Sequence, residues 1–169
     1  ADERREVASI TKLMTALLVL EALDRDEIAL TDSVQISPRA AAMKGSQALL
    51  DASAVYPLED LLRTTIMASA NDSAVALSEY IAGSEENFVD RMNRRAAELG
   101  MTNTNYVNCT GYPQSGQYTT ARDVCRLCCE IAKHPRYNQY ASVWIDKLTH
   151  PGGRVTDLTN TNRLVRFYE

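Results

Sequence analysis

The chain has 169 residues, 45% of them hydrophobic and 24% charged, a composition typical of one globular unit with a sizeable core. Its 18 Lys and Arg residues against 22 Asp and Glu residues give a net charge of −4, so nucleic acid is not an expected partner. The longest apolar run, Leu13 to Leu20, is interrupted by Thr15 and closed by Glu21, which is far short of a membrane span.

Helical periodicity dominates the chain. Apolar residues at helical spacing follow Ser9, which we place at or next to the N-cap of the first helix. The polar run of residues 69–72 separates two later helices, and Ser84 followed by two acidic residues is a strong helix-start signal. The predicted helices, in chain order, are residues 9–25, 40–43, 58–68, 73–81, 84–99, 120–134 and 136–141.

Extended structure is predicted at only two places. Residues 34–36 alternate in polarity, and residues 143–149 and 154–158 form a hairpin that turns at Pro151-Gly152-Gly153. Residues 101–118 are rich in Asn, Thr, Gly and Pro and are predicted to form a structured loop. We find no internal repeat, low-complexity tract or linker, so residues 1–169 are predicted to be a single unit, mainly α with a small β hairpin.

The cysteines are the candidate metal ligands of this sequence. The four cysteines are Cys109, Cys125, Cys128 and Cys129. The last three share one helix face, and zinc ligation together with Cys109 is an alternative. Small apolar core residues are the favoured interpretation, with no metal and no cofactor. His134 and His150 are interpreted as surface residues that stabilise the ends of elements, and Trp144 as a core or hairpin anchor.

The motif Ser9-Ile10-Thr11-Lys12 begins the first helix. A serine hydroxyl needs a neighbouring base to act as a nucleophile, and residues three apart on a helix face the same way. The positive end of the helix disfavours a protonated Lys12, and its free N–H groups can stabilise an oxyanion. The spacing suits acyl transfer, but S-x-x-K arises by chance about once in a few hundred residues, and a capping serine with a surface lysine is the alternative.

A second polar triplet, Ser69-Ala70-Asn71, lies about sixty residues downstream between two predicted helices. There Ser69 can relay a proton to a leaving amine, and Asn71 can hold Lys12 and donate to a substrate amide. Taken alone, this triplet is also typical of residues that end one helix and cap the next. Its occurrence together with the Ser9–Lys12 pair, in this order, favours the catalytic interpretation.

The two motifs resemble the S-x-x-K and S-x-N signatures of low-molecular-mass penicillin-binding proteins, the serine-type D-alanyl-D-alanine carboxypeptidases. The segment EVASITKLMTALLVLEAL resembles their active-site helix, and MKGSQALLDASAVYPLEDLLRTTIMASANDSAVALSEYIAGS resembles the following segment through the second motif. MTNTNYVNCTGYPQSGQYTTARDVCRLCCEIAKHP resembles their next loop and helix, and TNTNRLVRFYE the approach to a third motif. The resemblance covers nearly the whole chain.

The resemblance implies roles for four residues. Ser9 would be the acylated nucleophile, Lys12 its general base, Ser69 a catalytic partner and Asn71 a substrate-binding residue. The implied substrates are peptidoglycan stem pentapeptides, which would lose their terminal D-alanine, and β-lactams, which would acylate the same serine. The implied location is outside the cytoplasm, at the outer face of the cytoplasmic membrane or in the periplasm or cell wall.

The family's third motif, K-T-G, is absent, and only eight residues precede Ser9. We therefore expect residues 1–169 to be the helical subdomain of the serine DD-peptidase/β-lactamase-like α/β fold, cut at both ends and lacking most of its central sheet. The 169 residues alone are then expected to show little carboxypeptidase activity. They are also expected to self-associate through the exposed sheet-facing surface. The alternatives are a β-lactamase-like serine hydrolase and a non-enzymatic helical interaction module.

Overall fold

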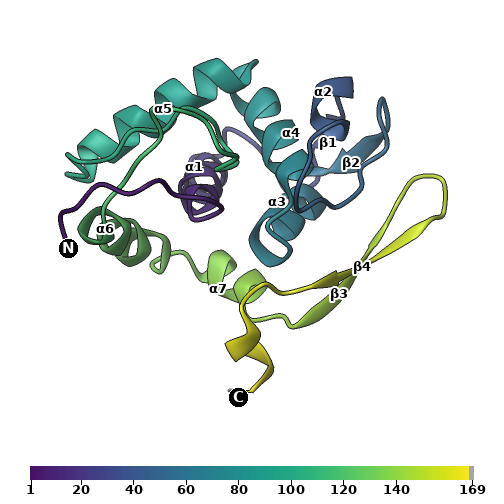
Figure 1. Ribbon diagram of the computed structural model, residues 1–169. Helices are drawn as coiled ribbons and strands as arrows, with labels where there is room; N and C mark the ends of the chain where they lie inside the picture. Colours follow the sequence, from purple (N-terminus) through teal and green to yellow (C-terminus); the bar gives the residue numbers. More distant parts are fainter. Residues whose placement is uncertain (168–169) are drawn as a thin grey trace.

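The computed structural model describes residues 1–167 and is mainly helical, with two small antiparallel sheets (Figure 1). The prediction of a mainly α fold is therefore confirmed. The elements are α1 (Thr11–Asp24), β1 (Ser33–Gln35), α2 (Pro38–Ala41), β2 (Val55–Pro57), α3 (Leu58–Met67), α4 (Asn71–Ala82), α5 (Glu85–Glu98), α6 (Ala121–Ile131), α7 (Pro135–Ala141), β3 (Ile145–Thr149), β4 (Val155–Thr159) and the 3-10 helix η1 (Arg163–Arg166).

Helix α1 lies in the middle of the molecule, where it contacts α3, α4, α5, α6 and α7 (Figure 1). Its buried residues occupy every side of the helix, which is typical of a central helix rather than a surface one. They are Thr11, Lys12, Met14, Thr15, Ala16, Leu17, Val19, Leu20 and Ala22. The central position carries the polar first turn of α1, and with it a lysine, into the interior.

The helix ends follow the capping residues. Ser84 accepts a hydrogen bond from the Asn87 N–H at the start of α5, and Thr120 accepts one from Asp123 at the start of α6. Helix α4, however, begins at Asn71, two residues earlier than predicted. The Asp72 carboxylate is fully buried in its first turn and accepts hydrogen bonds from the backbone N–H groups of residues 48 and 50. These long-range hydrogen bonds stabilise Asp72 in the first turn of α4, although the polar run of residues 69–72 predicted a loop there.

The predicted hairpin is confirmed as β3 and β4, which pair in antiparallel register from Ile145 opposite Thr159 to Thr149 opposite Val155. A second two-stranded sheet, in addition to the predicted hairpin, pairs β1 with β2, and β1 includes part of the predicted extended segment at residues 34–36. Strand β2 has only three residues and ends in proline, which gives too short a pattern to predict a strand.

The tip of the β3–β4 hairpin is anchored on β2 through His150. This residue is only 2% exposed, so its interpretation as a surface residue is wrong. Its Nδ1 lies 2.6 Å from the Tyr56 hydroxyl, and its Nε2 lies 2.8 Å from the Thr156 hydroxyl. Burial lowers the pKa of His150, and nearby Arg154 lowers it further. The neutral imidazole therefore forms part of a buried polar contact between the two sheets.

The cysteines divide into two groups. Cys109 is buried, as predicted, but the interpretation of the other three as core residues is wrong, because Cys125, Cys128 and Cys129 are exposed. Helix α6 buries Leu127 and Ile131 instead. The three thiols do share one helix face, but that face points to solvent, and residues 1–167 contain no cluster of candidate metal ligands.

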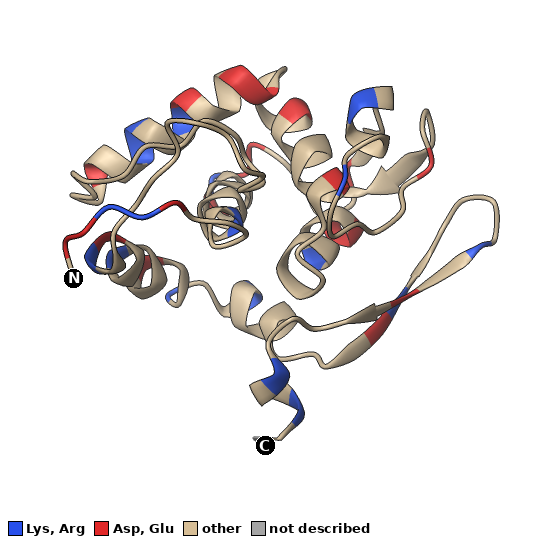
Figure 2. Ribbon diagram, in the orientation of Figure 1, with Lys and Arg blue, Asp and Glu red and all other residues tan. Residues whose placement is uncertain are grey.

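Charges of both signs are interspersed over the molecule (Figure 2). Arg95 of α5, for example, forms ion pairs with Glu21, Glu98 and Glu130 from three different elements. These pairs connect α5 to α1 and α6, around the buried core. Among residues 1–167, no helix is long and apolar enough to cross a membrane.

Candidate active site

Ser9 lies in a tight turn just before α1. The Thr11 N–H donates to the Ala8 carbonyl at 3.0 Å, and the Lys12 N–H donates to the Ser9 carbonyl at 3.0 Å. The helix itself begins at Thr11, with Ile10 at the N-cap and no capping side chain. Ser9 therefore lies next to the N-cap, within the predicted placement, but its side chain does not cap the helix. Its hydroxyl is left available for another partner, and its side chain is exposed.

That partner is Lys12. The side chain of Lys12 is almost completely buried, and its Nζ donates to Ser9 Oγ at 3.1 Å and to the Thr110 carbonyl at 2.7 Å. Burial lowers the pKa of Lys12 to about 8. The expected pairing is thus present, although burial replaces the helix terminus as the cause of the lowered pKa. A neutral amine hydrogen-bonded to a hydroxyl has the geometry of a general base.

Ser69 faces the same space as Ser9. It is the middle residue of the break between α3 and α4, and its φ of +55° is in the left-handed region that non-glycine residues rarely adopt. Its Oγ is buried and makes no hydrogen bond within residues 1–167. Ser9 and Ser69 line one open cavity of about 290 Å³, together with Ile10, Leu13, Ile66, Tyr137, Ala141, Asn160, Thr161 and Asn162. An unpaired hydroxyl on a strained residue is typical of a functional site.

Asn71 is buried at the start of α4. It lies two residues after Ser69 in the sequence, but it is not among the residues that line the cavity. Its Nδ2 donates to the Lys44 carbonyl at 2.6 Å, and its backbone N–H donates to the Ser46 carbonyl at 2.8 Å. The expected contact between Asn71 and Lys12 is not formed: the Asn71 amide is bonded to Lys44, and the Lys12 amine to Ser9 and Thr110. Asn71 instead fixes the 44–46 segment against α4.

The loop of residues 108–111 contacts the Ser9–Lys12 pair, although no chemical role was predicted for it. Asn108 Oδ1 accepts hydrogen bonds from the N–H groups of Thr110 and Gly111, at 3.2 and 2.7 Å. This turn presents the Thr110 carbonyl to Lys12. Gly111 has a φ of +79° and packs so closely on the Ala8 carbonyl that a Cβ would overlap it. The Asn-x-x-Gly spacing of residues 108–111 is typical of a fixed turn and could have predicted one. It could not predict that this turn packs against Ala8 and Lys12, which are about a hundred residues away in the sequence.

Asn160 also lines the cavity and was not singled out from the sequence. It is buried, and its Nδ2 donates to the carbonyls of Ala141 and Val143, at 2.9 and 2.8 Å. These bonds connect the end of β4 to the end of α7. The part of the cavity wall that contains Asn160 is therefore held by a buried amide rather than by apolar packing alone.

The sequence of this chain is similar to those of known proteins. A family model described as D-alanyl-D-alanine carboxypeptidase matches residues 1–169. DacF of Bacillus subtilis, a D-alanyl-D-alanine carboxypeptidase, is 40% identical over 168 residues, which cover 99% of this chain and 43% of DacF. The carboxypeptidase DacC of Escherichia coli is 40% identical over 134 residues, covering 75% of this chain and 33% of DacC.

The fold agrees with these sequences. The crystal structure of penicillin binding protein 5 from Haemophilus influenzae superposes with a TM-score of 0.90 at 32% identity, over 98% of this chain and 48% of that one. The chain thus spans less than half the length of these relatives. It belongs to the family of serine-type D-alanyl-D-alanine carboxypeptidases.

Proposed function

We propose that the protein containing this chain removes the terminal D-alanine of peptidoglycan stem pentapeptides through an acyl-enzyme on Ser9. The main support for this proposal is the 3.1 Å contact between Lys12 Nζ and Ser9 Oγ, together with burial that lowers the pKa of Lys12 to about 8. At pH 7 about one tenth of such lysines carry the neutral amine, against well below a hundredth for an ordinary lysine. The family membership of the chain supports the same reaction.

The chemistry proceeds in two steps. Ser9 Oγ attacks the carbonyl carbon of the penultimate peptide bond, and its proton passes to the Lys12 amine. The C–N bond then breaks, the departing amine of D-alanine takes a proton, and the acyl group remains on Ser9 as an ester. Water cleaves this ester and restores the serine hydroxyl. With penicillin the same attack opens the lactam ring, and the amine stays attached to the acyl group.

Ser69 and Asn71 complete the proposed site. The Ser69 hydroxyl lines the same cavity and has no hydrogen-bond partner among residues 1–167, which supports a role in passing the proton to the departing amine. Asn71 uses one amide N–H for the Lys44 carbonyl, and a carboxamide has a second N–H and an oxygen available for a substrate amide. No cofactor takes part in this chemistry.

The experiment that tests the proposal is covalent labelling with a fluorescent penicillin. The protein is digested after incubation, and mass spectrometry locates the penicilloyl group, which we expect on Ser9. Ser9→Ala should abolish labelling, and Ser115→Ala, which removes an exposed serine outside the cavity, should not. Absence of labelling in the unsubstituted protein, or labelling elsewhere, would refute the proposal. Rapid release of the penicilloyl group would indicate a β-lactamase instead.

Two further expectations concern the 169 residues alone. Because the relatives are more than twice as long, we expect this segment by itself to release D-alanine much more slowly than the protein containing it. Exposed apolar side chains at Ile10, Ile145, Leu164 and Phe167 support self-association of the isolated segment, which sedimentation measures. The proposed substrate is a cell-wall polymer, which supports an exported location at the outer face of the cytoplasmic membrane or in the periplasm.

A further inference from the structure

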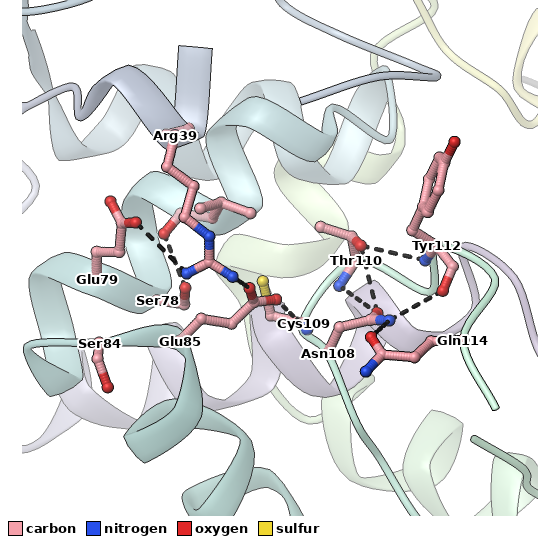
Figure 3. Close-up of polar contacts among 12 residues, drawn as sticks. Arg39, Ser78, Glu79, Ser84, Glu85, Asn108, Cys109, Thr110, Tyr112 and Gln114 are labelled. Atoms are coloured by element: carbon pink, nitrogen blue, oxygen red, sulfur yellow. Dashed lines mark hydrogen bonds and ion pairs between the residues drawn. The ribbon is translucent and has the colours of Figure 1, made fainter. Parts of the chain in front are cut away.

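An ion pair between the buried Glu85 carboxylate and the half-exposed Arg39 guanidinium lies next to the loop that contacts Lys12 (Figure 3). Glu85, the first residue of α5, is only 7% exposed and accepts hydrogen bonds through both carboxylate oxygens. One oxygen pairs with the Arg39 guanidinium, and the other accepts from the Cys109 N–H at 2.9 Å. The Arg39 guanidinium also forms an ion pair with Glu79, at 3.8 Å between Arg39 Nη1 and Glu79 Oε1. Glu85 therefore connects α2 and α5 to the loop of residues 108–111.

We propose that Glu85, held by Arg39, is a positioning residue for Lys12, because it fixes the loop whose Thr110 carbonyl holds the lysine amine against Ser9. This inference rests on the proposed function and extends it to residues that touch neither the cavity nor the nucleophile. Neither Glu85 nor Arg39 lines the cavity of Ser9 and Ser69.

The geometry of the loop carries the argument. Cys109 is fixed on both sides of its backbone: its N–H donates to Glu85 of α5, and its carbonyl accepts from the Thr15 hydroxyl of α1 at 2.7 Å. The next carbonyl along the chain, that of Thr110, is the acceptor for Lys12. A shift of the Cys109 amide would therefore be transmitted directly to the carbonyl that holds Lys12, with no flexible side chain between them.

The charges explain why a carboxylate is needed. The buried Cys109 thiol stays neutral, since burial, and then the Glu85 carboxylate, raise its pKa. Within residues 1–167, the Lys12 amine has two acceptors, the Ser9 hydroxyl and the Thr110 carbonyl. A glutamine at position 85 would present an amide N–H group either to the Arg39 guanidinium or to the Cys109 N–H. Both of these groups are donors, so one of the two contacts is lost. The loop then loosens and water reaches Lys12.

The first experiment measures Lys12 directly and does not need activity. In the protein containing this chain, the ¹³Cε resonance of Lys12 is titrated by NMR in the parent and in the Glu85→Gln variant, with Lys12→Arg to assign the signal. We expect the Lys12 pKa to rise by at least one unit in Glu85→Gln, toward the ordinary value of about 10.4. Arg39→Lys keeps the positive charge and should retain the parent value. The matched control is Glu86→Gln, which removes a neighbouring exposed carboxylate from the same helix turn.

The second experiment is the pH profile of penicillin acylation. A rise of one unit in the Lys12 pKa lowers the neutral fraction, and hence the acylation rate at pH 7, about tenfold. With a one-unit rise, the rates of Glu85→Gln and the parent should approach each other at pH 10, because about nine tenths or more of Lys12 is then neutral in both. An unchanged Lys12 titration, or an acylation rate lowered equally at every pH, would overturn the inference and leave Glu85 a purely structural residue. If the parent is not acylated at all, the proposed function fails, and the NMR titration still decides the role of Glu85.

Discussion

Replacing Gly111 with alanine should damage both the fold and the site, because this glycine packs against the turn that carries Ser9. Its φ of +79° is in the left-handed region, where an added Cβ costs about 1 kcal/mol. The added Cβ would also overlap the Ala8 carbonyl oxygen, far inside the 3.0 Å separation that real Cβ contacts keep, and would lie 3.0 Å from Thr11 Oγ1. Relief of that overlap adds about 1–3 kcal/mol, as for other overpacked sites.

Gly83 provides a matched control. Its φ of +77° is nearly the same, but a Cβ there would meet no atom within 4 Å, so Gly83→Ala carries the conformational cost alone. For a unit of this size 1 kcal/mol corresponds to about 2–4 °C in melting temperature. Gly83→Ala should therefore lower the melting temperature by about 2–4 °C, and Gly111→Ala by about 4–16 °C.

Differential scanning calorimetry measures the two melting temperatures, and fluorescent penicillin measures acylation of the folded protein at 20 °C. Gly111→Ala must move the Ala8 turn to relieve the overlap, so we expect acylation of Ser9 to fall at least tenfold, while Gly83→Ala retains the parent rate. Equal destabilisation by the two substitutions would refute the reasoning, as would a Gly111→Ala protein that is acylated at the parent rate.

Burial lowers the pKa of Lys12 to about 8, so its neutral fraction, and with it the acylation rate, should rise roughly tenfold from pH 7 to pH 9. Stopped-flow mixing with a chromogenic β-lactam measures the acylation rate, and a rate that does not change with pH would contradict this prediction. Ser69→Gly should leave the melting temperature nearly unchanged, because glycine accepts the φ of +55°, yet slow D-alanine release; an undiminished rate would exclude the proton-transfer role. Iodoacetamide should modify three of the four cysteines of the native chain and spare Cys109, as intact mass shows, and four adducts would mean that the core opens. Burial lowers the pKa of His150 below 6.5, so the unfolded state binds more protons in acid, and the free energy of unfolding should fall below about pH 6.5; His150→Phe should reduce that fall in urea titrations.

The local elements follow from the sequence because their signals are local. Ser84 and Thr120 cap their helices as their side chains predict, and the Pro151–Gly153 turn closes the predicted hairpin. The pairing of Ser9 with Lys12 is also local, since three residues separate them at the start of one helix. The association of this pair with Ser69, by contrast, was indicated by motif order and by resemblance to a family rather than by any local rule.

The tertiary structure decided the environment of each of these residues. Periodicity predicts a helix from Ser9 onward, but it does not show that α1 is surrounded by five other helices, and that burial is what lowers the pKa of Lys12. The sequence pattern predicted that the three cysteines on one face of α6 are core residues. In the structure the core side of α6 is formed by Leu127 instead, and the three thiols are exposed. The contacts of the Thr110 carbonyl with Lys12 and of Glu85 with Cys109 join residues far apart in the chain. The candidate catalytic residues could thus be proposed from the sequence, whereas the burial and the long-range hydrogen bonds around them arise only when the chain folds.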